Sequence, residues 1–267
     1  MWKLLLIPLL FYLVLLALVF VFQGRLLFPA GAVGGASPLP PRAERLTLET
    51  GEGHRLHGVR LPPSAAPSGT LVLGFGGNGW NGDTVASYLH ATYPEAEIVV
   101  FHYRGYYPST GASSARALLD DAPLAYDFTV ERYRPRRIVA VGFSIGSGVA
   151  ASLAPRRPLD GLILVTPFDS LKAVAVGQFR WLPVRLLFRH EMKAADWLSG
   201  SAVPTAIIAG GRDTLIRPER TEGLRRSAGH VVYDRIIAGA GHNDIYDRPD
   251  FRAAMREALA RVLADPQ

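Results

Sequence analysis

One serine sits between two glycines where a strand-like run meets a helix-like run, and this junction limits the folds available to the chain. Residues 137–141 (RIVAV) are apolar and β-branched, as expected for a buried parallel strand. The motif GFSIG follows at 142–146, and the small residues 147–154 are compatible with a helix. Glycines are needed where a strand and a helix approach too closely for a Cβ. This context predicts that Ser144 is a nucleophile on a tight turn. An incidental serine in a glycine-rich turn is the alternative.

Most of the remaining chain alternates between strand-like and helix-like segments, and its 267 residues suffice for one domain with a large core. Strands are predicted at 45–49, 54–61, 70–75, 97–103, 136–141, 160–166, 205–209 and 231–237. Helices are predicted at 83–93, 113–132, 218–226 and 250–263. The alternation favours an α/β fold, with a mostly parallel sheet covered by helices on both faces. The first two strands alternate in polarity, as an antiparallel edge pair would.

Residues 1–28 are predicted to form an N-terminal membrane anchor with a transmembrane helix. No charged residue occurs in 4–22, and a helix of that length extends about 28 Å, close to the thickness of a bilayer core. The Gly, Pro and Ala residues of 29–41 indicate a linker to a domain at 42–267. The alternatives are a signal peptide cleaved near 30–32 and a buried core helix. The flanking charges do not decide which side of the membrane the domain faces.

A serine hydroxyl is a weak nucleophile, so it needs a base that is itself oriented by an acid. His242, between Gly241 and an asparagine, follows the last predicted strand, and Asp213 follows the strand before it. Because Ser144, Asp213 and His242 each follow a strand, we expect them to converge at the carboxyl edge of the sheet. Asp169 also follows a strand and is the alternative acid. His102 lies near the same edge and is considered for a supporting role.

The glycine-rich run GFGGNG at 74–79 follows a predicted strand and is expected to stabilise an oxyanion. The expected donors are the backbone N–H of Ile145 and one near Phe75 or Gly76. Asn78 is expected to cap the following helix, with bracing of the loop as the alternative. The run matches neither a P-loop nor a dinucleotide fingerprint, and no cluster has metal-ligand spacing. No cofactor and no metal are therefore expected.

Six short motifs together resemble those of one protein superfamily. They are GGN at 76–78, YRGY at 103–106, GFSIG at 142–146, TPFDS at 166–170, GRD at 211–213 and GHND at 241–244. With the apolar N-terminal segment, they make the chain similar to membrane-anchored serine hydrolases of the α/β-hydrolase superfamily, in the group of Bem46 and ABHD-type proteins. The order Ser144, Asp213, His242 is that of the superfamily's triad. Members often have a histidine ahead of the loop glycines, where this chain has Gly74 and Phe75.

Residues 169–200 interrupt the alternation of strands and helices. The segment is long for a connection and combines aromatic residues with the arginines at 180, 185 and 189. We expect a small cap insertion over the strand ends, whose apolar side lines an acyl pocket or touches a membrane. An ordinary connection with one helix packed on the domain is the alternative.

The function that these features favour is an anchored serine hydrolase that cleaves carboxylic esters or thioesters through an acyl-enzyme. The expected partners are a small acyl or lipid-like substrate and a membrane. A serine peptidase or a lysophospholipase would use the same triad, and a non-catalytic membrane-associated binding protein is the alternative of another class.

The net charge of +6 at pH 7 suits anionic lipid headgroups, although arginines on solvated faces give the same count. No nucleic-acid-binding module is recognisable, so nucleic acid is not expected as a partner. The chain has no cysteine, which excludes a disulfide framework and a thiol nucleophile. The sequence does not indicate the oligomeric state.

Overall fold

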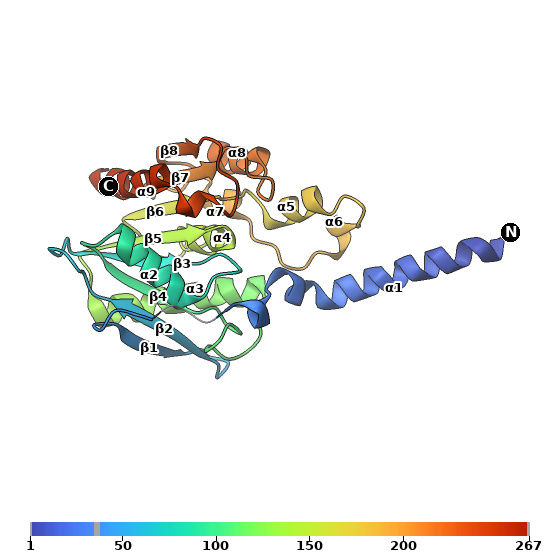
Figure 1. Cartoon of the computed structure of the whole chain (residues 1–267), viewed down its shortest axis with the longest axis horizontal. Helices are drawn as coiled ribbons and strands as arrows, with labels where there is room; N and C mark the ends of the chain where they lie inside the picture. Colours follow the sequence, from blue (N-terminus) through green and yellow to red (C-terminus); the bar gives the residue numbers. More distant parts are fainter. Residues whose placement is uncertain (1, 35–37, 266–267) are drawn as a thin grey trace.

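Strands far apart in the chain form one eight-stranded sheet within residues 2–34 and 38–265, which the computed structural model describes (Figure 1). They are β1 (Glu44–Glu49), β2 (Arg55–Leu61), β3 (Thr70–Phe75), β4 (Glu97–Phe101), β5 (Arg137–Phe143), β6 (Gly161–Val165), β7 (Thr205–Gly210) and β8 (Val231–Ile237). Their order across the sheet is β1-β2-β4-β3-β5-β6-β7-β8. Neighbours from β4 to β8 run parallel, whereas β2 is antiparallel to both β1 and β4. The predicted antiparallel pair at the edge of a mostly parallel sheet is confirmed.

Helices cover both faces of this sheet, as predicted. The helices of residues 2–34 and 38–265 are α1 (Trp2–Leu27), α2 (Gly82–Thr92), α3 (Ala115–Tyr133), α4 (Ile145–Ala151), α5 (Leu171–Gln178), α6 (Val184–Leu187), α7 (Ala194–Leu198), α8 (Pro218–Ser227) and α9 (Pro249–Ala264), with short 3₁₀ helices η1 (Ala30–Ala32) and η2 (Ile245–Asp247). Alternate strand residues point to opposite faces. In β5, Ile138 and Ala140 join a core with α3, α4, α7 and α8, whereas Val139, Val141 and Phe143 join a core with α2 and α9. The near-continuous apolar strands thus follow from burial on both faces.

The chain changes direction across the sheet between two neighbouring strands, β3 and β5. β3 pairs with β4 on one side and with β5 on the other. At such a switch point the loops after the two strands turn away from each other and leave a crevice at the carboxyl edge. The glycine-rich loop follows β3 and Ser144 follows β5, so both lie at this switch point on the carboxyl edge of the sheet.

The helix α1 is apolar over most of its length. Its stretch Leu6–Leu27 contains an 18-residue window with a mean hydropathy of 2.6 and is long enough to cross a membrane. Most side chains from Leu6 onward are exposed, and Ile7 and Phe11 each reach 71%. A buried core helix is therefore excluded, whereas a signal sequence near the N-terminus has the same properties. In Figure 1 the helix projects from the body of the protein, with its C-terminal end beside α5 and α6.

The segment 169–200 contains α5, α6 and α7 and lies partly against α1. α7 packs on α4 and α8, whereas α5 and α6 contact each other. Of the expected linker 29–41, residues 35–37 lie outside the described residues. At its start the chain is docked, because Phe28 is only 3% exposed and Ala30 packs against the same core.

Candidate active site

Ser144 occupies a backbone conformation that L-residues rarely adopt. Its φ is 51° and its ψ −118°, directly between the end of β5 and the start of α4. A Cβ on Gly142 would lie 2.2 Å from the carbonyl oxygen of Gly146. A Cβ on Gly146 would lie 2.2 Å from the carbonyl oxygen of Phe75. The two glycines therefore allow strand, helix and glycine-rich loop to meet at the serine. Strain of this kind occurs at functional positions that the surrounding structure holds in place.

The three side chains expected to converge form one hydrogen-bonded chain. Nδ1 of His242 lies 2.7 Å from Oδ2 of Asp213, and Nε2 of His242 lies 2.9 Å from Oγ of Ser144. A proton on Nδ1 that is donated to the carboxylate leaves Nε2 as the acceptor of the serine hydroxyl proton. The imidazole and the carboxylate are only 9% and 3% exposed. The structure thus brings together the three side chains that the sequence singles out, with His242 between the other two.

The carboxylate of Asp213 is fixed by its own loop. Oδ1 accepts hydrogen bonds from the backbone N–H of Leu215 (2.9 Å) and of Ile216 (2.7 Å). Both bonds hold the carboxylate with Oδ2 toward His242. A buried carboxylate needs such partners, because an unpaired buried charge is costly.

The alternative acid and the alternative histidine lie in other networks. Asp169 forms an ion pair with Arg220 at 3.0 Å and accepts a hydrogen bond from the N–H of Ser170. His102 is buried, and its Nε2 lies 3.1 Å from Oδ1 of Asp83. Burial acts to raise the pKa of Asp83, but hydrogen bonds from His102 and Arg45 outweigh it and leave that pKa lowered. Neither Asp169 nor His102 is hydrogen-bonded to His242 among the contacts of the described residues.

The glycine-rich loop after β3 lies beside Ser144. Ile145 opens α4, so its backbone N–H belongs to the first turn and has no acceptor within the helix. Phe75 ends β3 in register with Gly142, which brings Gly76 next to the serine turn. Gly77, which sequence reasoning did not single out, comes closest, since a Cβ there would lie 3.7 Å from Cβ of Ser144. The sequence signal for Gly77 was the pair Gly76-Gly77 itself, because residues without side chains allow a close approach of backbones.

The predicted capping role of Asn78 is wrong. Asn81 caps α2 instead, and its side chain accepts a hydrogen bond from the N–H of Asp83 at 2.9 Å. The side-chain amide of Asn78 donates to the carbonyl oxygen of Leu27, the last residue of α1. Asn78 therefore braces its loop, as the alternative expectation has it, and its partner lies in the N-terminal helix.

Two tyrosines after β4 hold the glycine-rich loop in place through hydrogen bonds to its carbonyl oxygens. The hydroxyl of Tyr103 donates to the carbonyl oxygen of Gly76 at 2.7 Å, and that of Tyr106 donates to the carbonyl oxygen of Asn78 at 2.9 Å. Burial raises the pKa of both phenols, so they stay protonated donors. The sequence motif at 103–106 is therefore structural, and its tyrosines fix the position of the loop.

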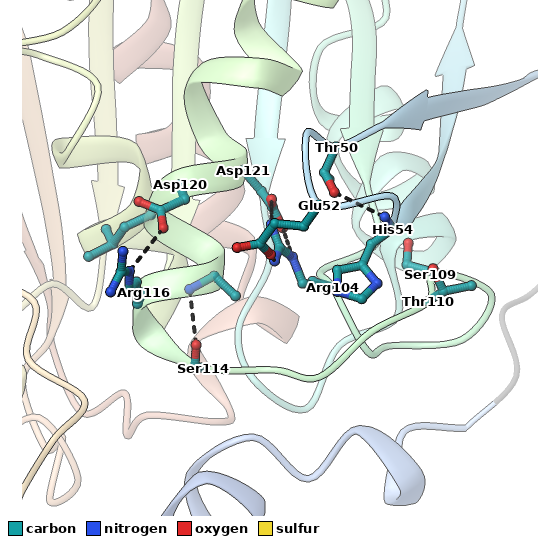
Figure 2. Close-up of polar contacts among 12 residues, drawn as sticks. Thr50, Glu52, His54, Arg104, Ser109, Thr110, Ser114, Arg116, Asp120 and Asp121 are labelled. Atoms are coloured by element: carbon teal, nitrogen blue, oxygen red, sulfur yellow. Dashed lines mark hydrogen bonds and ion pairs between the residues drawn. The ribbon is translucent and has the colours of Figure 1, made fainter.

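Figure 2 shows how the neighbouring Arg104 ties this turn to the rest of the domain. Its Nε lies 3.1 Å from Oδ2 of Asp121 in α3, and its guanidinium also pairs with Glu52 in the β1–β2 hairpin. The Arg104 and Asp121 side chains are both 9% exposed. Removing one partner of such a buried pair costs about 3–5 kcal/mol. The tyrosine turn is thus supported from α3 and from the edge of the sheet.

Within residues 2–34 and 38–265, no group of three or more His, Cys, Asp or Glu side chains is arranged to hold a metal ion. No protein-family model matches the chain.

Relatives of the chain include two proteins matched over most of their length. It is 33% identical over 227 residues to the uncharacterized protein Rv2307c of Mycobacterium tuberculosis, covering 83% of this chain and 81% of the relative. It is 27% identical over 261 residues to the uncharacterized membrane protein YNL320W of Saccharomyces cerevisiae, covering 91% and 90%. A shorter match of 32% over 111 residues, 40% of this chain and 28% of the relative, links it to lysophosphatidylserine lipase ABHD12 of Danio rerio.

Solved structures share the fold. An alpha-beta hydrolase from Vibrio vulnificus superposes with a TM-score of 0.72 at 21% identity, over 91% of this chain and 92% of that one. The Pyrococcus furiosus esterase Pf2001 superposes with a TM-score of 0.69 at 17% identity, over 86% and 96%. The sheet order, the serine turn after β5 and these likenesses agree: the chain has the α/β-hydrolase fold, belongs to one family with Rv2307c, and is similar over part of its length to an ABHD protein.

Proposed function

We propose that this protein is a serine hydrolase that cleaves carboxylic esters or thioesters of acyl or lipid-like substrates. The observation that carries the proposal is the chain of contacts from Asp213 through His242 to Ser144, at 2.7 and 2.9 Å. The names of two similar proteins, a lysophosphatidylserine lipase and an esterase, support an ester substrate.

The residues divide the reaction into two steps. Oγ of Ser144 attacks the ester carbonyl carbon while His242 takes the hydroxyl proton, and His242 then returns that proton to the leaving oxygen or sulfur. Asp213 orients the imidazole and stabilises its charged form. Water, deprotonated by His242, hydrolyses the resulting acyl-enzyme and regenerates the serine.

The negative charge on the tetrahedral intermediate needs backbone donors. The N–H of Ile145 is one, and the loop at Phe75, Gly76 and Gly77 supplies the other. Tyr103 and Tyr106 hold this loop before substrate arrives, so little reorganisation is needed during the reaction. One such donor contributes about 10²–10³ in rate.

The helix α1 serves as a membrane anchor in this proposal. Its apolar stretch Leu6–Leu27 is long enough to span a bilayer, and the yeast relative is named a membrane protein. A single-pass N-terminal anchor places the carboxyl edge of the sheet close to lipid, where acyl substrates are concentrated.

The test is labelling of the full-length protein with a fluorophosphonate, together with hydrolysis of p-nitrophenyl acetate. The wild type should label and turn over, whereas Ser144→Ala should do neither. Ser87→Ala is the matched control, because the Oγ of Ser87 is buried in α2 without a hydrogen-bond partner among the described residues. Equal labelling of wild type and Ser144→Ala would show that Ser144 is not the nucleophile.

The same reagents separate the other candidate functions. Labelling of Ser144 with cleavage of peptides but not of esters would indicate a serine peptidase, and preference for single-chain phospholipids would indicate a lysophospholipase. A folded protein that neither labels nor hydrolyses would be a non-catalytic membrane-associated binding protein.

A further inference from the structure

An apolar pocket lies between α1 and the segment 169–200. Its volume is about 370 Å³, and fourteen of the sixteen described residues that line it are apolar. Val19 and Leu27 contribute from α1, Val174 and Ala175 from α5, and Leu187 from α6. We call this the α1 pocket. Its size is in the range of pockets that bind small organic ligands.

The two polar residues of the α1 pocket, Gln23 and Gln178, form hydrogen bonds between their side-chain amides and backbone groups. The Nε2 of Gln23 donates to the carbonyl of Leu187 (3.1 Å), and its Oε1 accepts from the N–H of Arg189 (2.9 Å). The Nε2 of Gln178 donates to the carbonyls of Thr214 and Leu215, both at 2.8 Å. Because the amide nitrogens of both glutamines are hydrogen-bonded to the protein, the walls favour an apolar ligand and disfavour water.

The same contacts fix α1 in one position on the domain. Arg189 also donates from its guanidinium to the carbonyl of Phe20 (3.0 Å) and stacks 4.4 Å above the centre of the Phe20 ring. Gln23 itself is only 7% exposed. These contacts fix both the rotation of α1 about its axis and its position along that axis, so the helix forms a defined wall of the pocket.

Two walls of the α1 pocket continue into the loops of the candidate active site. The N–H of Leu215 donates to Oδ1 of Asp213 at 2.9 Å, and the carbonyl of Leu27 accepts from Asn78 at 2.9 Å. One wall residue thus belongs to the loop of the acid and another touches the glycine-rich loop. The α1 pocket and the two loops that flank Ser144 are therefore joined by direct hydrogen bonds.

The position of the pocket along α1 argues for a lipid as the occupant. The hydroxyl of Tyr12 donates to the carbonyl of Trp181 (3.0 Å), so the segment 169–200 reaches halfway up the helix. The ten residues Trp2–Phe11 beyond that contact extend about 15 Å, half of a bilayer core of about 30 Å. With α1 spanning a membrane, the tip of the segment enters the lipid. Its exposed apolar residues fit this place: Phe179 (49%), Trp181 (59%) and Leu186 (85%).

We propose that the α1 pocket binds the long acyl chain of a membrane lipid whose ester carbonyl is presented to Ser144. In this arrangement α1 is a wall of the substrate site as well as the anchor, and the chain enters from the bilayer without crossing water. The proposal rests on the proposed hydrolase function of Ser144.

The first experiment fills the pocket and compares chain lengths. Ala175→Phe places a ring in the α1 pocket, whereas Ala173, on the same helix, lines the neighbouring groove that includes Lys172 and Arg220 and does not line the α1 pocket. Each full-length variant in detergent micelles is assayed with p-nitrophenyl acetate and p-nitrophenyl dodecanoate. Ala175→Phe should lower the dodecanoate-to-acetate ratio of kcat/KM about tenfold or more. Ala173→Phe should leave the ratio at the wild-type value. An unchanged ratio in Ala175→Phe would overturn the proposal.

The second experiment detects binding without catalysis. Ser144→Ala is photolysed with a dodecanoate that carries a diazirine on its terminal carbon, and the adducts are mapped by mass spectrometry. Adducts at Val19 or Leu187 that excess dodecanoate competes away support the pocket. Adducts only on the lipid-facing residues Leu13 and Leu18 overturn it, even when wild-type Ser144 labels with a fluorophosphonate. If excess dodecanoate competes away adducts in the α1 pocket but the wild type does not label with a fluorophosphonate, the hydrolase function is rejected and the lipid-binding site stands.

Discussion

The side-chain amide of Asn78 donates a hydrogen bond to the carbonyl oxygen of Leu27, at 2.9 Å. Asn78 belongs to the glycine-rich loop beside Ser144, and Leu27 is the last residue of α1. The last carbonyls of a helix have no partner within it, so Asn78 satisfies one of them. The N-terminal helix is thereby attached to the loop that the proposed reaction uses for its oxyanion.

Asn78→Ala should therefore lower both stability and activity. Loss of the hydrogen bond costs about 0.5–1.5 kcal/mol of unfolding free energy, and a freer loop should lower kcat for p-nitrophenyl acetate several-fold. Thermal melting and steady-state kinetics measure the two effects. Asn81→Ala is the control, because it removes the cap of α2 at a cost of about 1 kcal/mol without releasing the loop. Equal kcat values in the two variants would contradict the role of Asn78.

Gly146→Ala should disrupt the serine turn. The added Cβ would lie 2.2 Å from the carbonyl oxygen of Phe75 and 2.5 Å from that of Gly76, and both are backbone atoms that cannot rotate away. We expect a loss of about 3 kcal/mol or more in unfolding free energy, at the upper end of overpacking costs. The loss of fluorophosphonate labelling should accompany it. Gly31→Ala, whose Cβ would meet nothing within 4 Å, should melt like the wild type. Full activity of Gly146→Ala would show that Gly146 does not lie as close to the carbonyl oxygens of Phe75 and Gly76 as the structure has it.

Asp213→Asn should separate folding from catalysis. The amide oxygen can still accept from the N–H groups of Leu215 and Ile216, so the loop should remain folded. The amide nitrogen would face His242 as a donor and favour the wrong tautomer, which in a serine-protease triad costs about 10⁴ in kcat. The variant should melt near the wild type while hydrolysis of p-nitrophenyl acetate nearly vanishes. Asp169→Asn, which alters only the pair with Arg220, should keep most activity. Comparable activity in the two variants would remove Asp213 from the mechanism.

The sheet and the three converging side chains could be predicted because their signals are local. Buried parallel strands such as β5 appear as apolar, β-branched runs, and loops that follow such strands share one edge of the sheet. The glycines at 142 and 146 indicate a close approach of backbones from the sequence alone. β5 extends two residues beyond the predicted end at 141, because its pairing with β6 continues to Phe143 and Val165.

The supports of the site could not be predicted, because they join residues without a periodic pattern between them. The hydroxyl of Tyr103 reaches a carbonyl 27 residues away, and Asn78 reaches one 51 residues away. The rotation of α1 was equally hidden, since a helix that is apolar on every side has no face to read. Gln23 was the only polar residue between Tyr12 and Arg25 apart from a glycine, and its contacts to Leu187 and Arg189 define that face.

The buried imidazole of His190 should make the stability of the folded protein sensitive to acid. It is 9% exposed, packs edge-on against Phe28 with ring centres 5.5 Å apart, and its Nδ1 accepts from the N–H of Ala115 at 3.4 Å. Burial first, and then the positive charge of Arg189, lower the pKa of His190 below its usual value. In the unfolded chain that pKa is about 6.5, so below this pH the unfolded state binds more protons than the folded state. The free energy of unfolding should therefore fall as the pH drops below about 6.5, and should level off once His190 is protonated in the folded protein as well. His190→Phe retains an aromatic ring but cannot titrate. Between pH 7.5 and pH 5.5, the melting temperature of the wild type should therefore fall by more than that of the variant. A constant difference between the two melting temperatures over this range would show that His190 does not carry the acid sensitivity.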